Sequence, residues 1–225
     1  MKILLIEDEQ LLADSILKYL QKENYLCEVA YDFDTASEKI ALYQYDIIIL
    51  DITLPGGNGL ELLRQIKKAK MRASVIIISA RNSVEDKILG LDLGADDYIT
   101  KPFHLAELNA RIKSNFRKRN FEGNKEIVYD KITLNIDTAE VRVCGEPILL
   151  TRKEYELLLY FINNRERIVT KEAIAEHLWG DNIDTVDSFD FIYTHIKNLR
   201  KKIMEKGGDN YIKTVYSMGY KFHKD

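Results

Sequence analysis

The hydrophobic positions of the first 120 residues alternate between short apolar runs and segments with helical spacing. Five runs predict strands, at Ile3–Ile6, Cys27–Ala30, Asp46–Leu50, Val75–Ile78 and Tyr98–Thr100. Runs that are apolar throughout indicate strands buried on both faces. Strand and helix alternating five times predict an α/β fold, a doubly wound five-stranded parallel sheet whose ligand site lies at the carboxyl ends of the strands.

The pattern changes beyond residue 119. The polar segment 120–125 is typical of a linker, so we expect a first domain over 1–119 and a second over 126–225. In the second domain the pattern predicts strands near 126–129, 131–136, 140–143, 146–149, 212–215 and 219–223, and helices near 151–163, 170–178 and 187–205. A sheet, three helices and a terminal hairpin make an α+β domain.

Composition and charge restrict the classes of protein that remain. The chain has 225 residues, 46% of them hydrophobic, with 33 Lys and Arg against 36 Asp and Glu. These values allow two domains with proper cores and exclude global disorder. We expect a cytoplasmic protein without a membrane partner, because no apolar run could span a bilayer and the N-terminus has no signal-peptide pattern. Cys27 and Cys144 have neither disulfide nor zinc spacing and are expected to be small core residues.

Polar side chains follow four of the predicted strands. Glu7 and Asp8 come after the first strand, Asp51 after the third, Ser79 after the fourth and Lys101 after the fifth. If the strand order makes these strands neighbours, their polar side chains converge. Crowded carboxylates repel one another unless a divalent cation is bound, and Mg²⁺ prefers such oxygen ligands. The set therefore predicts a magnesium site where a carboxylate accepts a phosphoryl group, with Lys101 and Ser79 contacting its oxygens.

Each of these residues also has a plain structural explanation. An acidic pair after a strand often caps a helix, and a single aspartate at a strand end has no greater meaning. An aromatic residue such as Tyr98 is a common half-buried side chain of a strand. Their joint occurrence at carboxyl ends favours the functional interpretation.

Three motifs of this region resemble the receiver domain of bacterial two-component response regulators, a flavodoxin-like fold. They are Leu5-Ile6-Glu7-Asp8-Glu9, Leu50-Asp51-Ile52-Thr53-Leu54-Pro55-Gly56 and Gly94-Ala95-Asp96-Asp97-Tyr98-Ile99-Thr100-Lys101-Pro102-Phe103. The resemblance covers residues 1 to about 120. It implies that a histidine kinase phosphorylates Asp51, and that Glu7, Asp8, Asp51 and the backbone carbonyl of Thr53 hold Mg²⁺.

The same resemblance assigns roles to the remaining receiver residues. It implies that Ser79 and Tyr98 form a switch and that Lys101 contacts the phosphoryl group, next to a cis Lys101-Pro102 peptide. Phosphorylation would draw Ser79 inward and let the Tyr98 ring turn in. Four charged residues match positions of intersubunit ion pairs in the resembling subfamily: Lys87, Asp97, Glu107 and Arg111. The resemblance thus implies a homodimer formed on phosphorylation, although a merely solvated face has the same charges.

The last predicted helix, 187–205, has the pattern of a nucleic-acid-binding element. Its apolar stripe consists of Ile192, Ile196, Leu199 and Ile203, with basic and polar residues opposite. Residues 121–190 carry 8 Lys and Arg against 15 Asp and Glu, whereas 191–224 carry 8 against 2, so the positive charge is local. This favours a helix-turn-helix in the DNA major groove over a solvated charged face.

Four segments resemble the OmpR/PhoB-type winged helix-turn-helix over about 126 to 223. They are Leu149-Leu150-Thr151-Arg152-Lys153-Glu154-Tyr155-Glu156-Leu157-Leu158, Leu178-Trp179-Gly180, His195-Ile196-Lys197-Asn198-Leu199-Arg200-Lys201-Lys202-Ile203 and Tyr211-Ile212-Lys213-Thr214-Val215-Tyr216-Ser217-Met218-Gly219-Tyr220-Lys221-Phe222. The resemblance implies DNA contacts at His195, Lys197, Asn198, Arg200, Lys201, Thr214 and Tyr216. The family often has arginine at the positions of Asp190, Asn198 and Tyr216. These departures affect which DNA sequence the chain would recognise, and not whether it binds DNA.

Together these features predict a phosphorylation-controlled DNA-binding transcription regulator rather than an enzyme. The expected partners are a sensor histidine kinase, double-stranded promoter DNA, a second copy of the chain and RNA polymerase, with Mg²⁺ as cofactor. One alternative is a Mg²⁺-dependent aspartyl-phosphate phosphatase, but such enzymes place a second acid where this chain has Thr53. Another is an adaptor with a protein-binding second domain, which the basic 191–224 segment disfavours.

Overall fold

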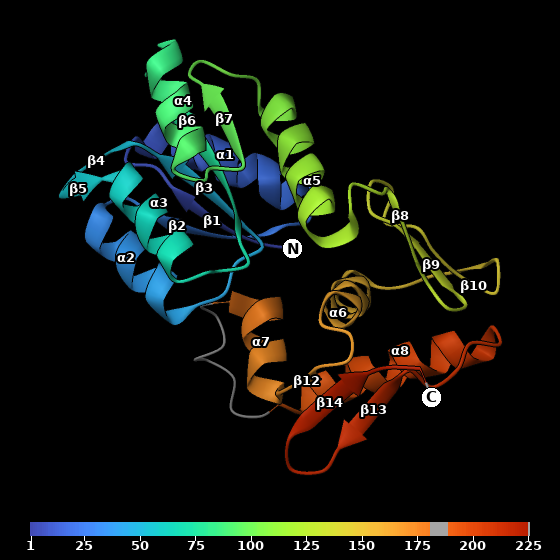
Figure 1. Cartoon of the computed structure of the whole chain (residues 1–225). Coiled ribbons are helices and arrows are strands. Elements are labelled where there is room, and N and C mark those ends of the chain that lie inside the picture. Colours follow the sequence, from blue (N-terminus) through green and yellow to red (C-terminus); the bar gives the residue numbers. More distant parts are fainter. Residues whose placement is uncertain (181–188, 225) are drawn as a thin grey trace. The chain divides into compact units, whose positions relative to one another are not determined.

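Five parallel strands form the sheet of the first of two compact units. The computed structural model describes residues 1–180 and 189–224, which divide into Met1–Arg119 and a second unit from Asn120 onward (Figure 1). The strands are β1 (Lys2–Ile6), β2 (Leu26–Ala30), β3 (Ile47–Asp51), β6 (Ser74–Ser79) and β7 (Asp97–Thr100), in the order β2-β1-β3-β6-β7. Each neighbouring pair is parallel. The predicted α/β fold and all five predicted strands are confirmed.

Helices cover both faces of this sheet, which explains why its strands are apolar throughout. They are α1 (Gln10–Lys22), α2 (Phe33–Leu42), α3 (Gly59–Lys68), α4 (Val84–Asp92) and α5 (Leu105–Phe121). Successive strand side chains point to opposite faces. On one face, Leu4, Ile48 and Val75 join a core with residues of α2 and α3, and α1 and α5 lie together on the other (Figure 1). Strands β4 (Thr53–Leu54) and β5 (Gly57–Asn58) form a hairpin. Each has two residues, which is too short for the sequence pattern to predict.

The strand order places a topological switch point between β1 and β3. From β1 the chain crosses to β2 on one side, and β3 lies on the other side of β1. Ile6 pairs with Leu50, and Asp51 pairs with Ile78, so the residues at the ends of β1, β3 and β6 are adjacent. Ligands of open α/β sheets bind at such a point, outside the carboxyl ends of the strands.

The second unit is the predicted α+β domain. A four-stranded antiparallel sheet runs β11-β10-β9-β8, from β8 (Glu126–Tyr129), β9 (Ile132–Asn135), β10 (Val141–Val143) and β11 (Glu146–Ile148). Three helices follow, α6 (Arg152–Asn163), α7 (Lys171–Trp179) and α8 (Asp190–Glu205), and β13 (Ile212–Val215) and β14 (Gly219–Phe222) form the terminal hairpin. Strand β12 (Ile168–Val169) pairs with β14 and was not predicted. Residues 187 and 188 of the expected helix 187–205 lie outside the described residues.

A shared core holds α6, α8 and the terminal hairpin together. Thr151 and Glu154 form a capping box at the start of α6. Further along α6, Phe161 packs against Phe222 of β14 with ring centroids 6.0 Å apart. Buried aromatic side chains of this size contribute much of the stability of a small domain.

The two cysteines are not the core residues that we expected. Cys27 is half-buried on β2, an edge strand of the sheet, and Cys144 is exposed in the turn between β10 and β11. The prediction from residue type failed for Cys144 because a residue in a turn is exposed by its backbone position, whatever its side chain prefers. Among the described residues no helix is both long enough and apolar enough to cross a bilayer.

Candidate functional site

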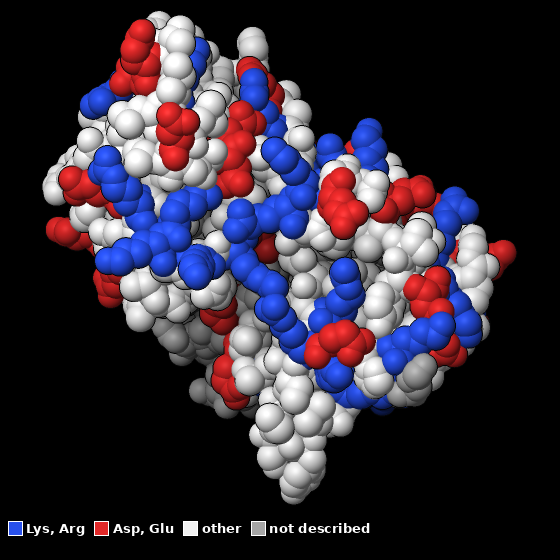
Figure 2. Space-filling view, in the orientation of Figure 1, with Lys and Arg blue, Asp and Glu red and all other residues white. Residues whose placement is uncertain are grey.

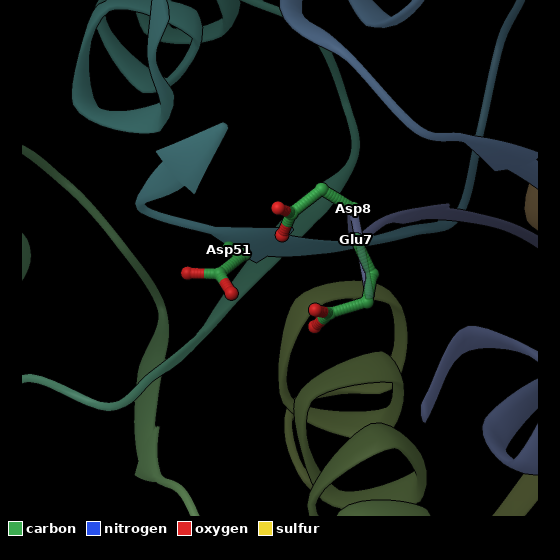
Figure 3. A group of neighbouring side chains, drawn as sticks. All are labelled: Glu7, Asp8 and Asp51. Atoms are coloured by element: carbon green, nitrogen blue, oxygen red, sulfur yellow. The ribbon is translucent and has the colours of Figure 1, made fainter. Parts of the chain in front are cut away.

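The acidic side chains that follow β1 and β3 meet at the switch point. Glu7 is fully buried, Asp51 is 5% exposed and Asp8 is exposed. One carboxylate oxygen of each lies within 4.8 Å of the other two, and the three groups lie side by side at the strand ends (Figure 3). They converge because the carboxyl ends of parallel strands share one edge of the sheet.

Lys101, just after β7, completes this cluster. Its Nζ lies 2.6 Å from Asp51 Oδ2 and 2.7 Å from Glu7 Oε2, and its peptide bond to Pro102 is cis, as the resemblance implied. Burial raises the pKa of Glu7, although Lys101 acts against this. Burial by itself would lower the pKa of Lys101, but hydrogen bonds to Asp51 and Glu7 raise that pKa above its usual value. The cluster therefore has three carboxyl groups and one ammonium group, which contacts Glu7 and Asp51, and this leaves an excess of acidic groups.

The donors of this cluster fit a Mg²⁺ ion. Mg²⁺ takes hard oxygen ligands and is commonly held by one or two carboxylates. Among the described residues, the buried Glu7 Oε2 finds no hydrogen-bond donor in suitable geometry, and its close neighbour is the Lys101 ammonium. Thr53, whose carbonyl the resemblance assigns to the metal, begins β4 beside the cluster, and its N–H donates to Asp51 Oδ1 at 3.0 Å.

Gly59, which the sequence pattern did not single out, allows this geometry. It is the first residue of α3, and its N–H donates to the carbonyl of Ile52 at 2.8 Å. A Cβ at this position would lie 2.1 Å from the carbonyl oxygen of Asp51. Glycine is a poor helix former, so a glycine opening a helix was the signal that could have revealed this close approach.

Ser79 and Tyr98, the expected switch pair, both contact the segment that follows β6. Ser79 is buried, and its Oγ accepts the N–H of Arg81 at 3.2 Å. The hydroxyl of the half-buried Tyr98 donates to the carbonyl of Arg81 at 2.9 Å, and burial raises the pKa of this phenol. Its ring lies against α4, where a Cβ on Gly90 would come within 3.2 Å of it. The two side chains are thus linked through one backbone unit, that of Arg81.

The charged residues assigned to a dimer face lie on α4, β7 and α5. Within one chain, Arg111 pairs with Asp97 at 3.0 Å and with Glu107 at 2.9 Å. Hydrogen bonding to Glu107, and then to Asp97, raises the pKa of Arg111 against the effect of burial. In the part of the chain that the structure describes, Lys87 on α4 has no acidic partner.

The same face carries an apolar stripe that the sequence pattern did not reveal. On α4, Val84 is 65% exposed, Ile88 52% and Leu91 46%. Their spacing of four and three residues aligns them along one side of the helix. An exposed apolar stripe marks an interaction surface. The spacing alone could not show this, because a buried stripe has the same period.

The polar side of α8 is open to solvent, as a DNA-reading helix requires. Its predicted stripe is buried and consists of Ile192, Ile196, Leu199 and Ile203. On the other side, Thr194, Lys197, Asn198 and Lys201 are exposed. The preceding helix α7 packs against α8 through Trp179 and Phe191, whose ring centroids are 4.3 Å apart. This pair of helices is the expected helix-turn-helix.

Two of the residues expected to contact DNA also make contacts within the domain. Arg200 donates from Nε to the carbonyl of Ile212 at 2.8 Å and from Nη2 to Thr214 Oγ1 at 3.0 Å. It thereby ties α8 to β13. His195 is half-buried beside Trp179, and its buried Nδ1 finds no hydrogen-bond partner among the described residues. Burial lowers the pKa of His195, so its imidazole is neutral near pH 7.

The hairpin of β13 and β14 forms the wing beside α8. Tyr216 at its tip is 92% exposed, and Thr214 is exposed on β13. A groove of about 390 Å³ separates the wing from the helices, and its lining includes Lys171, Tyr193 and Tyr216. The Nζ of Lys171 lies 4.7 Å from the centre of the Tyr193 ring. The sequence analysis did not identify Lys171, because a single lysine at the start of a helix does not indicate a binding groove.

Known proteins match both halves of the chain. Residues 3–113 match the response regulator receiver domain family, and 145–222 match the family described as transcriptional regulatory protein, C terminal. The chain is 41% identical to response regulator ArlR of Staphylococcus saprophyticus, over 97% of both chains. It is 37% identical to transcriptional regulatory protein BasR of Escherichia coli, over 98% of this chain and 96% of that one.

A solved structure agrees for the first unit. The receiver domain of the Francisella response regulator 1452 is 35% identical over 52% of this chain and 97% of that one, with a TM-score of 0.50. The acidic pocket lies in the half that matches receivers, and the winged helix-turn-helix lies in the half that matches transcriptional regulators. The chain therefore belongs to the OmpR/PhoB family of two-component response regulators and is a phosphorylation-dependent transcription regulator.

Proposed function

We propose that Asp51 accepts a phosphoryl group from a sensor histidine kinase and that this step controls DNA binding by the chain. One observation carries the proposal: Asp51 lies 2.6 Å from the Lys101 ammonium and within 4.8 Å of carboxylate oxygens of both Glu7 and Asp8. A nucleophilic carboxylate needs cations beside it, here the Lys101 ammonium and a Mg²⁺ ion that the neighbouring carboxylates would hold, because an anionic phosphoryl group must approach it.

The residues of the pocket divide this task. Mg²⁺, held by Glu7, Asp8, Asp51 and the carbonyl of Thr53, would offset the negative charge of the incoming group. A carboxylate oxygen of Asp51 attacks the phosphorus of the kinase phosphohistidine. A P–O bond forms, the P–N bond breaks and the imidazole leaves. The Lys101 ammonium then contacts a phosphoryl oxygen, because it already lies against Asp51.

Ser79 and Tyr98 would transmit the change. A phosphoryl oxygen would accept a hydrogen bond from the hydroxyl of Ser79, whose oxygen accepts the N–H of Arg81, and would draw Ser79 and the segment after it inward. Movement of this segment also removes the carbonyl to which Tyr98 donates, so the ring turns inward. Gly90 presents no side chain to the ring, which a Cβ at this position would approach to 3.2 Å. The outcome is a changed surface on α4.

The α4, β7 and α5 surface then pairs with its copy in a homodimer. In a two-fold interface the same patch serves both partners. The exposed stripe of Val84, Ile88 and Leu91 becomes buried there. Lys87 has no acidic partner among the described residues, and Glu107 remains 44% exposed although it contacts Arg111. We therefore pair Lys87 of each chain with Glu107 of its partner, beside the Arg111–Asp97 pair.

DNA recognition follows from α8 and the wing. Lys197, Asn198 and Lys201 are exposed for contact with the major groove, and asparagine reads adenine in a bidentate manner. Thr214 and Tyr216 extend the contact along the wing. Arg200 and His195 position these elements as well as facing the DNA, since both are partly engaged within the domain.

The remaining partners follow from this role. Two such domains in a dimer bind adjacent half-sites, which raises their effective concentration. A regulator bound at a promoter would contact RNA polymerase. The protein acts in the cytoplasm, where phosphate donor and promoter meet, and its one chemical step is regulatory rather than metabolic.

A phosphodonor assay tests the proposal. Asp51→Asn should abolish labelling of the full chain by acetyl phosphate or by a phosphorylated histidine kinase, followed by intact-protein mass spectrometry. Omission of Mg²⁺ should abolish labelling of the parent as well. Asp34→Asn, an exposed aspartate on α2, is the matched control and should be labelled normally. Undiminished labelling of Asp51→Asn would exclude Asp51 as the acceptor.

A further inference from the structure

A basic surface at the end of the receiver unit opposite its acidic pocket has no role in the proposed mechanism. The unit has 17 Lys and Arg residues, five of them in 64–72 and three in 117–119, and these two segments contain no acidic residue. Segment 64–72 is the second half of α3 with the loop to β6, and segment 117–119 is in the last turns of α5. In Figure 2, blue side chains gather over this part of the unit.

The two segments form one surface. Arg119 donates from Nη2 to the carbonyl of Met71 at 3.0 Å, which joins the end of α5 to the loop after α3. Lys67 and Arg119 share one acid, Asp96, at 3.0 and 3.6 Å. In the described part of the chain, Arg64, Lys68, Lys70, Arg72 and Lys118 are exposed and have no acidic partner. We call these five residues the basic patch.

Local structure explains only part of the basic patch. Cations in the last turn of a helix stabilise it through the helix dipole, which accounts for Lys68 at the end of α3 and Lys118 near the end of α5. Lys70 and Arg72 lie beyond the end of α3, in the loop, where the dipole gives no reason for a cation. Neighbouring like charges without acids repel one another, and an anionic partner would relieve this repulsion.

We propose that the basic patch binds the phosphate backbone of duplex DNA flanking the site read by α8 and the wing. The chain leaves the receiver at this end, through α5. Only residues 122–125 separate α5 from β8, and four extended residues span at most about 14 Å. DNA held by the second unit is therefore present at high effective concentration. This inference rests on DNA binding by the second unit.

The composition of the patch favours DNA over a protein. Among the described residues, no large apolar side chain of 64–72 or 117–119 is exposed, whereas protein interfaces have an apolar centre. Isolated exposed cations contact phosphates without reading sequence. The patch would thus strengthen binding uniformly, and its contribution would show in the salt dependence, because each phosphate contact releases counterions.

The test measures binding of the full chain to a labelled 40-base-pair duplex of mixed sequence over a range of salt concentrations. The patch variant is Lys68→Gln/Lys70→Gln/Arg72→Gln. Loss of three phosphate contacts should reduce the slope of log K against log salt by about 3 and weaken binding roughly 100-fold at 0.1 M salt. Thermal melting should be unchanged, because all three side chains are exposed.

The matched control removes two lysines and one arginine elsewhere. Lys125→Gln/Lys131→Gln/Arg142→Gln changes the net charge equally, but each of these cations already pairs with an acid, Asp137, Asp209 and Glu140 respectively. The control should keep the parental slope. An unchanged slope in the patch variant, or an equal loss in the control, would overturn the patch while leaving the proposed function intact.

Two further outcomes separate the remaining cases. Failure of the parent to bind any duplex would overturn DNA binding by the second unit, and the patch proposal with it. Patch-dependent binding to vesicles containing phosphatidylserine, with an unchanged DNA slope, would overturn the patch proposal in favour of an anionic lipid surface.

Discussion

Gly59 shows how one residue without a functional group sets the geometry of the phosphoryl-accepting pocket. Its missing Cβ lets α3 begin against the carbonyl of Asp51. The N–H of Gly59 then bonds to Ile52, and Asn58 caps the helix by accepting the N–H of Leu60 at 2.9 Å. The start of α3 thus packs against the backbone of Asp51, and this contact helps to hold the Asp51 side chain toward Lys101.

We predict that Gly59→Ala destabilises the receiver unit and impairs phosphorylation together. A methyl group 2.1 Å from a backbone oxygen cannot be accommodated without a shift of α3 or of Asp51. Overpacking of this kind costs about 1–3 kcal/mol. Urea unfolding would measure the loss, and acetyl phosphate labelling would measure the effect on Asp51.

Gly123→Ala serves as the reference. Gly123 has a φ of 86°, and a methyl group at this position would have no neighbour within 4 Å, so only backbone strain of about 1 kcal/mol is expected. Normal phosphorylation and normal stability of Gly59→Ala would contradict the role that we assign to the close approach.

Helix α8 and the wing act as one element because Arg200 joins them. Its hydrogen bonds end on the carbonyl of Ile212 and the hydroxyl of Thr214, and its guanidinium lies 5.8 Å from the centre of the Tyr220 ring. From the sequence, Arg200 is one more cation on a basic helix. Only the packing of β13 against α8 shows that its donors face inward.

We predict that Arg200→Lys weakens DNA binding although the positive charge is kept. Lysine cannot reproduce the planar fork that reaches both acceptors. Loss of these bonds should destabilise the second unit by about 1–2 kcal/mol and weaken DNA binding several-fold, as measured by urea unfolding and by titration of a DNA duplex.

Lys206→Arg is the companion variant, because Lys206 is exposed at the end of α8, has no assigned DNA contact, and its substitution also keeps the charge. It should bind DNA like the parent. If Arg200→Lys also bound like the parent, Arg200 would act as a simple charge rather than as a link between helix and wing.

The whole molecule is expected to switch by pairing two copies, and the charges of the α4, β7 and α5 surface allow a reciprocal test. Lys87→Glu and Glu107→Lys should each weaken the phosphorylated dimer by about tenfold, because two-fold symmetry repeats the altered pair twice. The double variant restores opposite charges and should recover dimerisation. Sedimentation velocity with and without acetyl phosphate measures this.

The double variant decides the interpretation. Single variants that dimerise normally would place the interface elsewhere. A double variant as weak as the single variants would show that Lys87 and Glu107 do not face each other across the two-fold axis.

The sequence shows the elements because each has a strong local pattern. Strands such as Ile47–Asp51 are apolar throughout, and the stripe of α8 repeats at helical spacing. It missed β4, β5 and β12, which have two residues each and are formed by their partners. It also misjudged Cys144, since a turn residue is exposed by its backbone position whatever its side chain prefers.

The sequence by itself determined the two folds, the family and the identity of the polar residues at each strand end, because periodicity and motifs are local properties of the chain. Only the tertiary structure decided what those residues do to one another. The strand order brought Lys101 to Asp51 across 50 positions, the packing of the wing turned Arg200 inward, and the bond from Arg119 to Met71 joined two basic segments into one surface. Such contacts join positions distant along the chain, so no local pattern records them.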